Sequence, residues 1–111
     1  MNETFKLNKM FCCAPLQNHV SAAGSRGLSV LVRKTPEGIR FLLQSRGVAF
    51  EDVSKLRPMP GSPDLKINIA CDVGLQFCPW CGQRLQELVK IAPERYDDLA
   101  KAHKALLSMD L

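Results

Sequence analysis

The chain has 111 residues, of which 46% are hydrophobic and 23% are charged, and its formal net charge at pH 7 is +4. This length and composition fit a single globular domain with a modest core, and they argue against a largely disordered chain. The basic excess is too small for a dedicated DNA-binding protein, and no hydrophobic run approaches the roughly 20 residues that span a bilayer. We therefore expect no membrane-spanning segment.

The beginning of the chain predicts a short helix after a polar segment. Residues 1–11 are mixed in polarity, and we expect them to form a flexible N-terminus. Helix signals begin at Ala14-Pro15, because proline suits the first turn of a helix. Leu16 and Val20 follow at helical spacing, and Gly24 ends the pattern.

The next segment predicts a β-hairpin. Two stretches rich in β-branched and aromatic residues, Leu28–Lys34 and Ile39–Arg46, flank the turn sequence Thr35-Pro36-Glu37-Gly38. Alternation along the second strand divides its side chains between two faces. We expect Ile39, Phe41 and Leu43 to face the core, and Arg40, Gln44 and Arg46 to point outward.

A third strand is predicted further along the chain. Residues 48–56 fit either a strand or a helical turn, and residues 57–64 hold three prolines and a glycine, which is typical of a surface loop. Apolar residues at every second position over residues 65–77 predict a strand, with a bulge near residues 72–74.

Two helices are predicted after residue 84. The first contains Leu85 and Leu88 and ends before Pro93, and the second runs from about Pro93 to Met109. The apolar stripe of the last helix either packs over the sheet or docks a partner. We predict an α+β fold with one N-terminal helix, a three-stranded and largely antiparallel sheet, a zinc-ribbon knuckle and two C-terminal helices.

Five cysteines are unevenly distributed: Cys12 and Cys13 are adjacent, Cys71 is isolated, and Cys78 and Cys81 are separated by two residues. A secreted disulfide scaffold normally has an even number of cysteines spread along the chain. No signal-peptide pattern precedes them. We predict a cytoplasmic protein whose thiols stay reduced and available for a metal.

The sequence Cys78-Pro79-Trp80-Cys81-Gly82 is a metal-binding turn motif. Two cysteines separated by two residues in a tight turn can place both sulfurs on one tetrahedral zinc ion. Glycine after the second cysteine allows the left-handed conformation that completes such a turn. The same spacing also occurs in redox proteins, but few residues follow Cys81, too few for the rest of a thioredoxin-like fold.

Cys78 and Cys81 supply only two of the four ligands of a tetrahedral zinc ion, and we predict that Cys12 and Cys13 supply the other two. His19, Cys71 and His103 are the alternatives for the fourth ligand. We expect His19 to lie on a helix flank, Cys71 to be a buried apolar residue and His103 to pack within the last helix. Residues 12–111 would then form a single zinc-binding domain.

These motifs give the chain a resemblance to a known group of proteins. The pair Cys12-Cys13, the hairpin, and Phe77-Cys78-Pro79-Trp80-Cys81-Gly82 with Leu85 resemble small uncharacterised bacterial zinc-ribbon-like proteins with an N-terminal Cys-Cys and a C-terminal CPxCG knuckle. The resemblance implies a structural zinc and no particular process. It does not extend to the helices after Leu85.

No phosphate-binding glycine loop and no His-Glu metal motif occur in the sequence, so enzymatic chemistry is not expected. We predict a non-enzymatic module that binds a protein partner. Weak nucleic-acid binding is one alternative, through a basic hairpin face made of Arg33, Lys34, Arg40 and Arg46. A thiol-redox protein that uses Cys78 and Cys81 is the other. The sequence leaves the oligomeric state open.

Overall fold

The computed structural model describes residues 10–55 and 70–107. The chain forms a three-stranded antiparallel sheet, in the order β1-β2-β3, with helices packed against it, which confirms the predicted α+β class. In chain order the elements are α1 (Ala14–Ser21), β1 (Gly27–Thr35), β2 (Gly38–Arg46), the 3-10 helix η1 (Phe50–Lys55), β3 (Ala70–Leu75), α2 (Leu85–Ile91), α3 (Pro93–His103) and the 3-10 turn η2 (Lys104–Leu106). Within these ranges no helix has the length and apolarity to cross a membrane.

The predicted hairpin is present with the predicted turn. The antiparallel register pairs Thr35 with Gly38, so Pro36 and Glu37 form the tip. Gly38 has a φ of 122°, a conformation that side-chain-bearing residues rarely adopt, and the Thr35 hydroxyl donates a 2.9 Å hydrogen bond to the Gly38 carbonyl. The local sequence therefore determines the position of the turn.

The third strand ends earlier than predicted, at Leu75, and is more regular. β3 pairs with β2 without interruption from Ala70 opposite Arg46 to Leu75 opposite Phe41, so the expected bulge at residues 72–74 is wrong. Residues 65–69 of the predicted strand and the predicted loop at 57–64 lie outside the described residues, as do residues 1–9 of the N-terminal segment. The ambiguous segment after β2 forms the helical turn η1.

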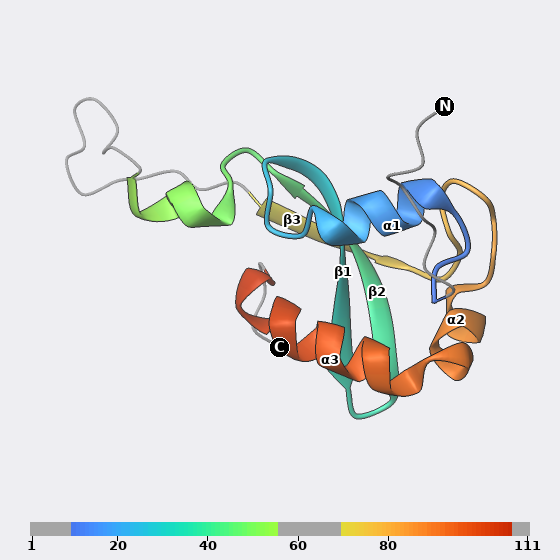
Figure 1. Ribbon diagram of the computed structural model, residues 1–111. Coiled ribbons are helices and arrows are strands. Elements are labelled where there is room, and N and C mark those ends of the chain that lie inside the picture. Colours follow the sequence, from blue (N-terminus) through green and yellow to red (C-terminus); the bar gives the residue numbers. More distant parts are fainter. Residues whose placement is uncertain (1–9, 56–69, 108–111) are drawn as a thin grey trace, which may run out of the picture.

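One face of the sheet carries the hydrophobic core. Strand residues on this face are covered by α1, α2 and α3, which Figure 1 shows around the hairpin. The buried apolar side chains include Leu16 and Val20 of α1, Val30 and Val32 of β1, Ile39 and Phe41 of β2, Leu85 and Leu88 of α2, and Tyr96 and Ala100 of α3. Burial of this apolar surface is the main stabilising contribution to the fold. The stripe of α3 thus packs over the sheet, the first of the two alternatives for this helix.

The opposite face of the sheet is also covered, at the position where Gln44 and Arg46 were expected to point outward. That expectation is wrong, because both side chains are buried. The Leu106 carbonyl of η2 accepts hydrogen bonds from Gln44 Nε2 at 2.8 Å and from Arg46 Nη2 at 3.0 Å. Arg46 Nε also donates to Gln44 Oε1 at 2.8 Å, and its guanidinium lies 5.5 Å from the centroid of the Phe50 ring. The alternation of polar residues correctly placed Gln44 and Arg46 on the face opposite the core, but it did not predict that η2 covers them there.

His103 joins the end of α3 to the free edge of β1. The Val32 amide donates a 3.0 Å hydrogen bond to His103 Nδ1, and the His103 side chain is buried. Because Nδ1 accepts this bond, the ring is neutral and its proton lies on Nε2. Burial lowers the pKa of His103, since desolvation disfavours the imidazolium.

We expect His103 to make the fold sensitive to acid. Because the pKa of His103 is lower in the folded state, the stability that its neutral ring contributes is fully present above the unfolded-state pKa of 6.5. This contribution is lost as the pH falls through the folded-state pKa. Replacing His103 with Asn keeps an acceptor and removes the titration. The free energy of unfolding should then fall less between pH 7 and pH 5 for His103→Asn than for wild type, measured by urea unfolding. Equal pH dependence for the two proteins would contradict this role.

Candidate metal centre

The Cys78–Gly82 segment forms a tight turn where the chain leaves the sheet. Phe77 and Arg84 form a β-bridge on either side of the turn. The Cys78 amide donates to the Gln83 carbonyl at 2.8 Å, and the Gly82 amide donates to the Cys78 carbonyl at 2.9 Å. Gly82 has a φ of 83°, which is the left-handed conformation expected for this position. These bonds hold both cysteines at the same end of the turn.

Cys12 and Cys13 lie immediately before α1. Cys13 is the N-cap of the helix, with an extended backbone at φ −161° and ψ 162°, and its carbonyl accepts a hydrogen bond from the Gln17 amide at 3.2 Å. The chain therefore bends at Cys13 as it enters the helix. Leu16 and Val20 pack α1 into the core, and Figure 1 shows the N-terminal end of α1 beside the loop that follows β3.

The sulfur atoms of Cys12, Cys13, Cys78 and Cys81 all lie within 4.8 Å of one another. The Sγ–Sγ distances are 4.0 Å for Cys12 and Cys13, 3.6 Å for Cys13 and Cys78, and 3.2 Å for Cys81 and Cys12. A tetrahedral ion with metal–sulfur bonds near 2.3 Å requires sulfur separations of about 3.8 Å. The cluster can therefore hold a single metal ion with small adjustments of the side chains.

The cluster lies between the core and the surface. Cys78 is only 3% exposed and belongs to the hydrophobic core, whereas Cys81 is exposed and the other two are intermediate. Burial raises the pKa of Cys12 and Cys13, because desolvation disfavours the thiolate. A hydrogen bond from the Gln83 backbone is the main cause that lowers the pKa of Cys81. All five cysteines of the chain are free thiols.

None of the three alternative ligands belongs to the sulfur cluster. His19 Nδ1 is 2.7 Å from the Pro15 carbonyl, and the His19 ring stacks on Trp80 with a centroid distance of 4.3 Å. His103 is engaged at the edge of β1. Cys71 lies on β3 opposite Ser45, and the expectation that it is buried is wrong, because its side chain is exposed at the outer strand of the sheet.

A buried tyrosine connects α3 to the segment that carries Cys12 and Cys13, which sequence analysis did not anticipate. The Tyr96 hydroxyl donates a hydrogen bond to the Met10 carbonyl. Its ring makes edge-on contacts with Phe11 and Phe41, at centroid distances of 6.2 and 5.4 Å. Burial raises the pKa of Tyr96, so the hydroxyl stays protonated and remains a donor. The apolar stripe of α3 indicated burial of Tyr96 but not its polar partner.

The basic face predicted on the hairpin is not formed as expected. Arg46 is buried, and Lys34 Nζ forms a 2.6 Å ion pair with Asp97 of α3. The Lys34 ammonium lowers the pKa of the Asp97 carboxyl. Arg33 and Arg40 are direct cross-strand partners, and Arg40 is exposed. Of the proposed basic residues, these two thus remain together on one face.

Comparisons of the chain with protein-family models, curated proteins and solved structures find no match. The zinc-ribbon-like resemblance therefore stays a prediction from the cysteine motifs. What the structure adds is the convergence of four sulfur atoms from two chain segments.

Proposed function

We propose that the chain is a small zinc-binding module in which the metal is structural and the protein acts by binding a protein partner. The convergence of four cysteine sulfurs is the observation that carries this proposal. Zinc is the ion most often held by four thiolates, and iron is the other common occupant of a tetrahedral sulfur site. Elemental analysis of the purified protein separates the two metals.

The metal would connect two chain segments that are distant in the sequence. Cys13 and Cys78 are separated by 65 positions, and their sulfurs are 3.6 Å apart. Short chains build modest cores, so a cross-link of this kind contributes strongly to stability. Because the ligands come together only in the folded chain, the free energy of metal binding becomes free energy of folding.

A structural role follows from the donor set. Catalytic zinc sites keep one position open for water or substrate, whereas four thiolates close the coordination shell. In the described part of the chain, the group of metal-binding side chains around these sulfurs consists of the four cysteines alone. Cys78 also lies in the core and not at the start of a helix, unlike the activated thiol of a redox protein.

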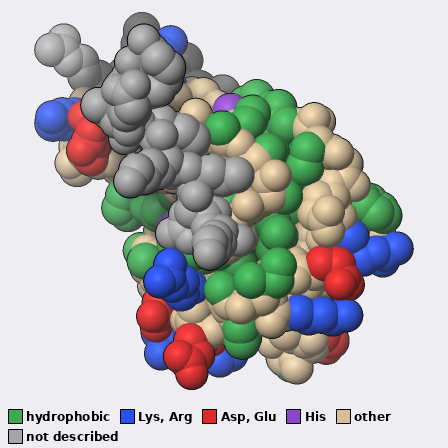
Figure 2. Space-filling view, turned by 45° about the vertical axis from the view of Figure 1, so that its right-hand side comes forward, with side chains coloured by type: hydrophobic (Ala, Val, Ile, Leu, Met, Phe, Trp, Pro, Cys, Tyr) green, Lys and Arg blue, Asp and Glu red, His purple; other side chains and the backbone are tan. Residues whose placement is uncertain are grey.

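Exposed aromatic side chains beside the cysteines offer a surface for the partner. Phe77 is 47% exposed and Trp80 is 39% exposed, on the same turn that carries Cys78 and Cys81. Figure 2 shows hydrophobic side chains in a band across one face of the molecule. Aromatic residues are enriched in protein interfaces, and a metal-held turn would present them rigidly at low entropic cost.

Partner binding is tested by affinity capture with matched variants. A specific protein should be recovered with the metal-loaded wild type and lost with Trp80→Ala. Ile91→Ala removes another exposed apolar side chain, at the end of α2, and should leave recovery unchanged. Equal recovery with both variants would contradict a role for this turn.

A further inference from the structure

The sheet has two outer strands, and the fold protects them differently. At the outer edge of β1 the Val32 amide donates its hydrogen bond to His103, and α3 packs against this strand. β3 is the other outer strand, and among the described residues it pairs only with β2. A strand edge that is paired on one side only is a template for another strand, because its outward N–H and C=O groups can extend the ladder.

β3 lacks most of the devices with which proteins block an outer strand. Ala70–Leu75 contains no proline and no lysine, and it pairs with β2 without a bulge. Its one charged side chain, Asp72, accepts a 2.8 Å hydrogen bond from Gln44 Nε2 on the neighbouring strand. Cys71 and Val73 share the other face of the strand and are exposed, Val73 by 55%. The outer edge of β3 is therefore open and carries apolar side chains.

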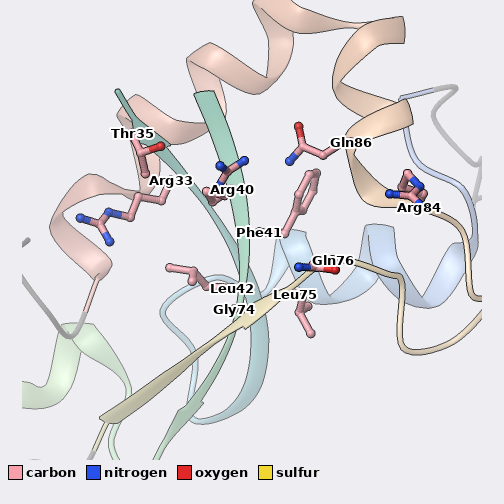
Figure 3. Close-up of a pocket in the computed structure, with 10 residues that line it drawn as sticks. All are labelled: Arg33, Thr35, Arg40, Phe41, Leu42, Gly74, Leu75, Gln76, Arg84 and Gln86. Carbon is pink, nitrogen blue, oxygen red and sulfur yellow. The ribbon is translucent and has the colours of Figure 1, made fainter. Parts of the chain in front are cut away.

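A pocket of about 570 Å³ bounds this edge at the end of β3. Gly74 and Leu75 line the pocket from β3, Arg40 lines it from β2, and Arg84 lines it from the segment before α2, as Figure 3 shows. The pairing of β3 with β2 ends at the same place, at Leu75. An added strand therefore has only the six residues of β3 along which it can pair.

The side chains of β3 favour one register for two copies of this edge. Two identical strands that pair antiparallel are related by a twofold axis, and directly opposite residues lie on the same face of the sheet. An axis at Asp72 would place two carboxylates opposite each other, and an axis at Cys71 or Gly74 would pair only one end of β3. An axis at Val73 gives complementary pairs: Val73 with Val73, Cys71 with Leu75, and Asp72 with Gly74. No atom lies within 4 Å of the position where a side chain at Gly74 would begin, which leaves room for Asp72 of the second copy.

We propose that two copies of the chain pair through the outer edges of β3, antiparallel and centred on Val73. The three strands of each copy then form one continuous sheet. Because the paired stretch is short, the contact buries less surface than a standard protein interface, and the dimer is weak. The cysteine cluster contributes no residue to β3, so a protein that proved monomeric would leave the proposed zinc site unaffected.

Sedimentation equilibrium of the metal-loaded full chain measures this association. From about 10 µM to about 1 mM, the wild type should shift from the chain mass of 12.3 kDa toward twice that mass. Val73→Lys places like charges directly opposite each other at the twofold axis and should weaken dimerisation about tenfold or more. Ile91→Lys makes the same change at an exposed apolar residue at the end of α2 and should dimerise like wild type. Metal content and circular dichroism show that each variant is folded.

Amide hydrogen exchange followed by NMR identifies the strand that is covered. In the dimer, the β3 amides that point away from β2 should exchange more slowly at the higher protein concentration, and Val73→Lys should remove this dependence. The proposal is overturned if the wild type stays monomeric at about 1 mM, or if the two lysine variants weaken association equally. In a monomer, slow exchange of β3 would assign the edge to another segment of the same chain, and fast exchange would leave it to a strand of a different protein. Both results exclude the second copy.

Discussion

Replacing Cys78 with serine is expected to abolish tight metal binding and to unfold the domain. Cys78 is the most buried of the clustered cysteines, at 3% exposure, and its sulfur lies 3.6 Å from that of Cys13. Structural zinc binding contributes about 10–16 kcal/mol in small zinc-dependent domains, which is comparable to the whole stability of an ordinary domain at about 5–15 kcal/mol. Circular dichroism should show loss of the cooperative thermal transition.

Cys71→Ser is the matched control for this experiment. Cys71 is exposed on β3 and does not belong to the sulfur cluster, so its replacement should change stability by less than about 0.5 kcal/mol. Metal content should remain at the wild-type level. If Cys78→Ser instead melts at the wild-type temperature and keeps its metal, the proposed cross-link between the two chain segments is wrong.

Replacing Tyr96 with alanine is expected to give the largest loss among the core positions. The ring is fully buried and contacts Phe11 and Phe41, so its removal should cost about 3–5 kcal/mol through lost burial and a cavity. The same change leaves the Met10 carbonyl without its hydroxyl donor. Because Met10 leads into Cys12, we also expect weaker retention of the metal in competition with a chelator.

Tyr96→Phe separates the hydrogen bond from the packing. It keeps the ring and removes the hydroxyl, so the expected loss is about 0.5–1.5 kcal/mol from the missing hydrogen bond. Urea unfolding of both variants measures the two contributions. If the alanine variant is no less stable than the phenylalanine variant, the packing of α3 on the sheet does not depend on this ring as the structure implies.

Short-range patterns predicted much of the fold. The turn residues before Gly38 and the alternating strands on either side of it specified the hairpin, because both signals act over a few residues. The turn at Gly82 followed from the same kind of local signal. The cysteine pairs indicated which sulfurs converge, since metal-binding chemistry constrains the residue type and the spacing.

Contacts between distant segments were not predictable in the same way. Gln44 and Arg46 are polar, and their burial depends on the Leu106 carbonyl, which lies 60 or more positions away. The bond between Val32 and His103 spans 71 positions. Neither leaves a periodic signal in the sequence, because each depends on where α3 and the turn η2 after it pack against the sheet.

The basic residues illustrate the same limit. Lys34 and Arg46 have the same charge as Arg40, but the first is paired with Asp97 and the second is buried. Arg84 lines the same pocket as Arg40, although it lies more than 40 positions from it and was not grouped with it from the sequence. Tertiary structure, and not local charge density, decides which cations share a surface.

Metal content of the fully reduced protein is the most direct measurement of the central claim. Native mass spectrometry of protein purified without added metal should show one zinc ion per folded chain. X-ray absorption at the zinc edge should then show four sulfur neighbours at about 2.3 Å. A reduced chain that is cooperatively folded and carries no metal, or one whose metal has fewer than four sulfur ligands, would contradict the closed four-cysteine site.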